Sequence, residues 1–115
     1  MKIYVSGSIK DNPNHREQFN KFCEYLRQWD PTLEVVNPMD IPACPDGRCK
    51  KTGHIVLASG HTWECYMRYD IPELLKCDAI IMMDGWKISR GAQFELYTAM
   101  TCGLTVFTER DWTFE

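Results

Sequence analysis

The chain has 115 residues, with no long apolar run and no excess of basic residues. Both absences reduce the number of function classes that the chain could belong to. No stretch is long and apolar enough to span a bilayer. The first residues, MKIYVSGSIKD, lack the apolar core and cleavage site of a secretory signal. The net charge is −3 and Lys and Arg are scattered, so we expect no membrane and no nucleic-acid polymer as a partner. A small anionic ligand is compatible with this charge, because a few local donors are enough to bind it.

Paired Cys-x2-Cys motifs are also missing, although the chain has six cysteines. Without a secretion signal we expect free thiols and a cytoplasmic location, in a bacterium or in a phage-infected host. Cys44, Cys49, His54, His61 and Cys65 could supply zinc ligands, but their spacing is loose compared with paired motifs. We therefore expect no metal and no cofactor, and a loop with reduced thiols, with a zinc site as the alternative.

Strand-like and helix-like segments alternate along the sequence. Short β-rich runs predict strands, and apolar residues at helical spacing predict helices, the second of which is broken or restarted at Pro72. In chain order we predict a strand at 2–6, a helix at 14–29, a strand at 33–36, a helix at 63–75, a strand at 79–83, a helix at 89–102 and a strand at 104–107. This alternation predicts one α/β domain over residues 1–115, a flavodoxin-like (Rossmann-like) doubly wound parallel sheet. The long irregular segment at about 40–62 is predicted to be a loop or lid.

Glycine and polar residues follow three predicted strands, at 6–8, 37–38 and 84–86. Ligands of doubly wound sheets bind at the carboxyl ends of the strands, so these residues are expected to meet at one rim. The run Gly7–Lys10 can bind a phosphate through its backbone N–H groups, and Ser89–Gly91 adds a helix N-terminus. The alternatives are an ordinary turn and a helix N-cap.

Glu95 is the most unusual of the acidic residues. It borders the apolar stripe of its helix, formed by Ala92, Leu96 and Ala99. Burying an unpaired carboxylate costs several kcal/mol, and carboxylates retained in such places are often functional. Asp70 and Asp84 have simpler interpretations, as a capping residue and a turn former.

These residues also carry a family resemblance. The run Tyr4–Lys10 (YVSGSIK), then Asp70, then Ser89-x-Gly91-x-x-x-Glu95 resemble the nucleoside 2-deoxyribosyltransferase superfamily. The closest branch in motif is the 2′-deoxynucleoside 5′-phosphate N-hydrolases. Residues 63–95 also resemble a small group of uncharacterised, largely phage-encoded members. The resemblance covers most of the chain except the loop at 40–61.

The resemblance implies an enzyme that hydrolyses the N-glycosidic bond of a (deoxy)nucleoside 5′-monophosphate and releases the free base. Glu95 would be the nucleophile, forming a glycosyl-enzyme ester at C1′. Asp70 would protonate the leaving base or position the sugar, and Tyr4 would orient Glu95. The 5′-phosphate would be held by Gly7, Ser8, Ile9, Lys10, Ser89 and Gly91, and the sugar and base would be lined by Asp84 and Trp86.

Alternatives accompany this expectation. One is base exchange by a nucleoside 2-deoxyribosyltransferase, and another is a non-catalytic module that binds or sequesters a nucleotide or nucleoside. Lys10 stands where the hydrolase branch carries arginine, so bidentate phosphate binding is lost. The resemblance also implies a homodimer or larger homo-oligomer, and the apolar residues Phe94 and Met100 are assigned to the core or to a helix-packed interface.

Overall fold

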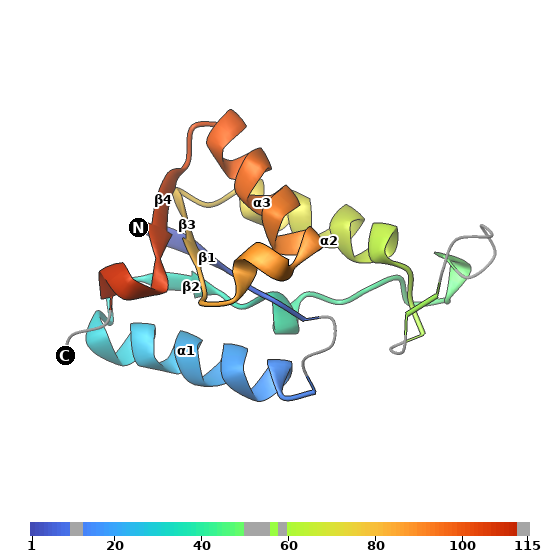
Figure 1. The fold of residues 1–115 in the computed structure, drawn as a ribbon, viewed down its shortest axis with the longest axis horizontal. Helices are drawn as coiled ribbons and strands as arrows, with labels where there is room; N and C mark the ends of the chain where they lie inside the picture. Colours follow the sequence, from blue (N-terminus) through green and yellow to red (C-terminus); the bar gives the residue numbers. More distant parts are fainter. Residues whose placement is uncertain (10–12, 50–55, 58–59, 113–115) are drawn as a thin grey trace.

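A four-stranded parallel sheet forms the centre of the protein (Figure 1). The computed structural model of the chain describes residues 1–9, 13–49, 56–57 and 60–112. The strands are β1 (Lys2–Ser6), β2 (Glu34–Val36), β3 (Ala79–Met82) and β4 (Thr105–Thr108). Their order in the sheet is β2-β1-β3-β4, with β1 paired in parallel to both β2 and β3. This order is that of a flavodoxin-like sheet, which confirms the predicted α/β fold class.

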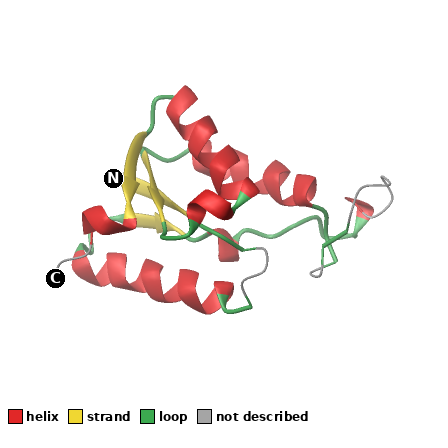
Figure 2. Ribbon diagram, viewed as in Figure 1, coloured by secondary structure: helices red, strands yellow, loops and turns green. Residues whose placement is uncertain are grey.

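Helices cover both faces of the sheet. Helix α1 (His15–Trp29) lies on one face, and helices α2 (Trp63–Leu75) and α3 (Arg90–Thr101) lie on the other (Figures 1 and 2). Three short 3-10 helices follow strands: η1 (Pro38–Asp40), η3 (Trp86–Ile88) and η4 (Glu109–Trp112). Parallel neighbours need crossover connections, so alternation of strand and helix follows from the sheet itself.

The side chains of β1 alternate between the two faces, as the period of two in a strand requires. Ile3 and Val5 pack on the α1 side with Phe19 and other apolar residues of that helix. Tyr4 packs on the α2–α3 side, in a cluster that includes Ala92. All four residues of β3 are buried, as predicted from its continuous apolar sequence.

Helix α2 continues through Pro72, where the sequence predicted a break. Proline removes one backbone hydrogen bond from a helix, yet the last turn is retained. Leu74 is completely buried against the sheet and Ile71 packs beside the same cluster. The burial of these two side chains holds the turn that proline alone would disfavour.

The predicted loop at about 40–62 follows η1 and precedes α2. Its described residues extend beyond the first turn of α2, away from the sheet (Figure 1). Within the part of the chain that the structure describes, no helix is both long enough and apolar enough to cross a membrane.

Candidate active site

Glu95 lies in the second turn of α3 and points toward the sheet. The helix begins after Ser89, whose Oγ accepts a hydrogen bond from the backbone N of Ala92 at 3.1 Å. Ala92, Glu95 and Ala99 form the buried face of α3, and Glu95 is only 5% exposed. A carboxyl group therefore occupies a position that this helix otherwise gives to small apolar residues.

Two hydroxyl groups of β1 bind the carboxylate of Glu95. Tyr4 Oη donates to Glu95 Oε2 at 2.5 Å, and Ser6 Oγ donates to Glu95 Oε1 at 2.7 Å. Tyr4 and Ser6 are two residues apart, so they share one face of the strand, and both are completely buried. Each carboxylate oxygen thus has its own donor, which stabilises the ionised form.

Ser6 was not among the residues selected from the sequence. It ends the predicted strand at 2–6 and belongs to the polar residues expected at the rim, and the period of two places it on the same face as Tyr4. That spacing was the signal that could have identified it.

The environment raises the pKa of Glu95 to about 7, because burial disfavours the charged form more than the hydrogen bonds from Tyr4 and Ser6 favour it. The pKa of Tyr4 is raised well above its usual value of 10.0, first by burial and then by the charges of Glu95 and Asp70. Tyr4 therefore stays protonated and remains a donor at neutral pH.

Asp70 is the second buried carboxyl group of the site. It lies on α2 and is 5% exposed. Burial, and then the negative charge of Glu95, raise the pKa of Asp70 to about 7. No described residue donates a hydrogen bond to Asp70, whereas Glu95 accepts two. The two hydrogen bonds favour the ionised form of Glu95, so this arrangement favours a proton on Asp70 when the pair holds one.

The two glycines predicted to approach a phosphate also permit close packing within the protein. A Cβ added at Gly7 would lie 3.1 Å from the Cβ of Met83, and one added at Gly91 would lie 3.3 Å from Nε1 of Trp63. This Nε1 is buried, with no hydrogen-bond partner in the described part of the chain. The glycines thus bring β1 and α3 close to their neighbours, in addition to any contact with a ligand.

The remaining residues of the predicted phosphate site lie after β1. Ile9 is 40% exposed and Ser8 is half-buried. Lys10 falls outside the described residues. The structure therefore places Ser8 and Ile9 at the carboxyl end of β1, as the rim argument expected.

The structure does not bring Asp84 to Glu95. Asp84 is exposed. The pKa of Glu109 is raised to about 7, first by the burial of Glu109 and then by a hydrogen bond with Asp84 and the charge of Asp84. With Met83 and Glu109 it lines an open hollow of about 600 Å³ on the α1 side of the sheet. Trp86 is half-buried and packs against the cluster that contains Tyr4, so it lies on the Glu95 side.

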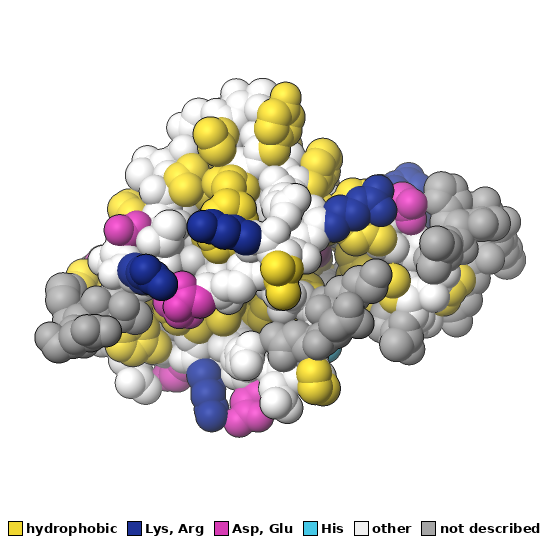
Figure 3. Space-filling view, viewed as in Figure 1, with side chains coloured by type: hydrophobic (Ala, Val, Ile, Leu, Met, Phe, Trp, Pro, Cys, Tyr) yellow, Lys and Arg dark blue, Asp and Glu magenta, His cyan; other side chains and the backbone are white. Residues whose placement is uncertain are grey.

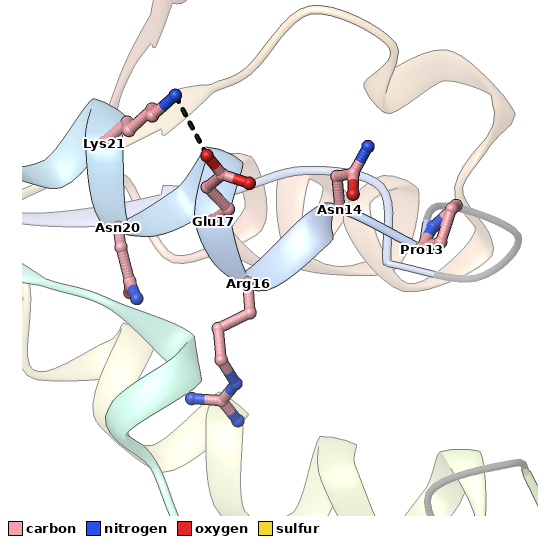
Figure 4. Close-up of a pocket in the computed structure, with 6 residues that line it drawn as sticks. All are labelled: Pro13, Asn14, Arg16, Glu17, Asn20 and Lys21. Atoms are coloured by element: carbon pink, nitrogen blue, oxygen red, sulfur yellow. Dashed lines mark ion pairs between the residues drawn. The ribbon is translucent and has the colours of Figure 1, made fainter.

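A second hollow, of about 450 Å³, lies at the start of α1 (Figure 4). Lys21 and Glu17 form an ion pair at 3.0 Å, whereas Arg16 and Asn20 point the other way (Figure 4). Asn20 Oδ1 accepts a hydrogen bond at 2.8 Å from Asn37, which follows β2. These residues were not predicted as site residues, because polar side chains at the start of a helix carry no specific signal in the sequence.

Comparisons with known proteins support the fold and identify the family. No match is found among curated protein sequences. Among solved structures, a conserved protein from Enterococcus faecalis V583 is similar, with a TM-score of 0.66 and 23% identity. The likeness covers 94% of this chain and 62% of that chain, so this chain spans less than two thirds of its neighbour. It supports the fold alone. The family model described as "Domain of unknown function (DUF4406)" matches residues 1–108, and the chain belongs to that family.

Proposed function

We propose that the protein hydrolyses the N-glycosidic bond of a (deoxy)nucleoside 5′-monophosphate through a covalent intermediate on Glu95. The observation that carries this proposal is the pairing of two buried carboxyl groups with different surroundings. Glu95 accepts hydrogen bonds from Tyr4 and Ser6, whereas Asp70 accepts none from a described residue and is the group that would hold a proton. The substrate class comes from the resemblance to the nucleoside 2-deoxyribosyltransferase superfamily.

In the first step, a carboxylate oxygen of Glu95 attacks C1′ and the bond from C1′ to the base nitrogen breaks. Asp70 gives its proton to the departing base, which leaves neutral. The products are a glycosyl ester on Glu95 and an ionised Asp70. An ionised nucleophile and a protonated acid at one centre are the two states that retaining glycosidases require.

In the second step, water attacks C1′ and the ester bond to Glu95 breaks. Asp70 takes the proton from the attacking water and returns to its starting form. Tyr4 and Ser6 again donate to the released carboxylate. The cycle consumes one water and leaves both carboxyl groups as they began.

We also propose that the 5′-phosphate binds between the turn after β1 and the N-terminus of α3. Ser89 Oγ accepts the capping hydrogen bond from Ala92, so its own proton is available to a phosphate oxygen. The helix dipole favours an anion at the same place, and Lys10 follows Ile9 in the sequence. Trp86 offers an aromatic face for the base.

The first test is incubation of the pure protein with a panel of ribo- and deoxyribonucleoside monophosphates and nucleosides, followed by chromatography for free base. We expect base release by the wild type and by Glu24→Gln, an exposed carboxylate on α1, and no release by Glu95→Gln. Release by Glu95→Gln equal to that of the wild type would refute the nucleophile. A parallel incubation with an added acceptor base distinguishes hydrolysis from base exchange, because only exchange yields a new nucleoside.

The phosphate site has its own test. Lys10→Ala and Ser89→Ala are expected to raise KM for nucleotides more than they lower kcat, because they remove binding rather than chemistry. Equal kcat/KM for a nucleoside and its 5′-monophosphate in the wild type would contradict a phosphate site.

We further propose that the enzyme acts in the cytoplasm as a homodimer, assembled through the outer face of α3. Phe94, Tyr97 and Met100 are 42%, 70% and 63% exposed and recur every three residues along this helix. Figure 3 shows hydrophobic side chains over this part of the molecule. An apolar helix face of this kind favours contact with a second copy.

A further inference from the structure

We propose that the protein binds one structural zinc ion through Cys44, Cys49, His61 and Cys65. The ligand atoms of these four side chains, three Sγ atoms and one ring nitrogen, all lie within 4.8 Å of one another. The proposal goes beyond the chemistry of Glu95 and does not depend on it. It also departs from the expectation of reduced thiols, which rested on the loose spacing of these residues in the sequence.

Four of the six distances within the cluster are close to those of a tetrahedral metal site, and the other two are within 4.8 Å. Sγ of Cys44 is 3.5 Å from Sγ of Cys49, and Nδ1 of His61 is 3.4 Å from both. The same Nδ1 is 3.9 Å from Sγ of Cys65. Zinc bonds of about 2.3 Å to sulfur and about 2.0 Å to nitrogen place neighbouring tetrahedral ligand atoms about 3.6–3.8 Å apart. The observed separations bracket that value.

Simple packing does not explain these cysteines. The buried thiols of Cys23 and Cys77 belong to the two hydrophobic clusters of the sheet, where cysteine acts as a small apolar residue. Cys44 and Cys65 are just as buried, at 6% and 4% exposed, but belong to neither cluster. Their sulfur atoms instead face other potential metal ligands.

Two turns bring the distant ligands together. Between Cys44 and Cys49, the side chain of Asp46 accepts a hydrogen bond from the backbone N of Arg48, and Gly47 has a φ of 68°. This left-handed conformation suits glycine and lets the chain reverse direction. The two sulfurs, five residues apart in the sequence, therefore meet on one side of the turn.

The other two ligands are fixed by the start of α2. His61 precedes the N-cap Thr62, whose side chain accepts a hydrogen bond from the backbone N of Cys65 at 3.1 Å. The ring of Tyr66 lies edge-on to that of His61, with centroids 6.0 Å apart. Backbone N of Cys44 donates to Sγ of Cys65 at 3.4 Å. A backbone donor to a ligating sulfur is a usual outer contact of a metal–thiolate site.

Three cysteines and one histidine form a complete ligand set for zinc. Tetrahedral sulfur and nitrogen ligands select zinc over magnesium or calcium, which prefer oxygen. Four protein ligands leave no open coordination position, so the ion has a structural role rather than a catalytic one. It would tie the described part of the loop at 41–49 to the first turn of α2.

The test is the metal content of the full-length protein, purified under reducing conditions with any histidine tag removed. Mass spectrometry of the acid-digested protein is expected to give about one zinc per chain in the wild type. Cys102→Ser, an exposed cysteine outside the cluster, should retain the ion. Cys49→Ser should lose zinc by about tenfold or more. A wild-type protein with no zinc, or a Cys49→Ser variant with the full wild-type amount, would overturn the proposal.

A second measurement does not depend on how well the Cys49→Ser variant folds. Cobalt added to chelator-treated wild type is expected to give the visible absorption of tetrahedral Co²⁺ together with thiolate charge transfer, saturating at one ion per chain. Zinc should then displace the cobalt and abolish both bands. Absence of this spectrum, or a disulfide linking Cys44 to Cys49 in the reduced preparation, would show that the cluster is not a metal site.

Discussion

The substitution Glu95→Gln gives the sharpest test of the candidate site, because it changes stability as well as activity. Burial raises the pKa of Glu95 from 4.5 to about 7. A carboxyl group whose pKa is raised by folding makes its full contribution to stability at pH values below its pKa in the unfolded chain. This contribution is lost as the pH rises through the folded pKa of about 7. Glutamine has nearly the same shape as glutamic acid and does not ionise. The contribution of residue 95 to the free energy of unfolding should therefore persist at high pH in Glu95→Gln.

The magnitude follows from the pKa difference of about 2.5, at ~1.4 kcal/mol for each pKa unit. Above pH 8, ionisation of Glu95 therefore costs the folded protein about 3 kcal/mol. Gln at this position can accept from Tyr4 and donate to Ser6, which keeps both contacts. Removing the charge of Glu95 also removes its repulsion of ionised Asp70, which further increases the stability of the variant at high pH. For a domain of this size the gain corresponds to roughly 10 °C in Tm.

The assay is urea unfolding followed by circular dichroism, at pH values from 5 to 8, for the wild type, Glu95→Gln and Glu24→Gln. The advantage of Glu95→Gln in the free energy of unfolding should be smallest at pH 5, about 1 kcal/mol, and largest at pH 8, about 3 kcal/mol. Glu24→Gln should follow the wild type at every pH, since Glu24 is exposed. The reasoning fails if Glu95→Gln is no more stable than the wild type at pH 8, or if its advantage is the same at both ends of the range.

Three further predictions concern other contacts. Ser6→Ala removes a hydrogen bond to Glu95, so the pKa of Glu95 should rise by about one unit or more, measured by NMR titration of its carboxyl carbon; an unchanged pKa would show that the 2.7 Å contact is unimportant. Gly7→Ala should destabilise the fold by about 1–3 kcal/mol in urea, because the new Cβ would crowd Met83, and equal stability would show that β1 can shift freely. Tyr97→Glu should convert the proposed dimer into a monomer in sedimentation experiments, and an unaffected dimer would exclude the outer face of α3 as the interface.

The sequence predicted the framework well because the framework depends on local patterns. Apolar spacing located the four strands and three long helices of the described residues, and the alternation of strand and helix led to the parallel sheet. The convergence of Tyr4, Asp70 and Glu95 was expected from the resemblance, and the sheet order places their elements side by side. Local patterns suffice here because the helices bury one apolar face and the central strands β1 and β3 bury both, and each case leaves its own spacing of apolar residues.

Two predictions from the sequence differ from the structure. One concerns the direction of a side chain, and the other a helical turn that is retained because of packing against the sheet. Asp84 was expected near the sugar, but the chain turns after β3 at Gly85, which has a φ of 90°, and Asp84 meets Glu109 instead. The break predicted at Pro72 is absent because burial of Leu74 outweighs the local preference. Neither effect can be recognised in a single segment, since each depends on an element distant in the sequence.

The contacts of Glu95 have a consequence for biosynthesis. The bond from Tyr4 joins residues 91 positions apart, and the bond from Ser6 joins residues 89 positions apart. β1 leaves the ribosome long before α3, so the carboxylate gains its donors only after both elements have been made. Contacts of such long sequence separation also form late in folding, because loop closure opposes them. A nascent, nicked or partly folded chain therefore carries Glu95 as an ordinary solvated glutamate, and the buried contacts of the candidate site arise only together with the complete sheet.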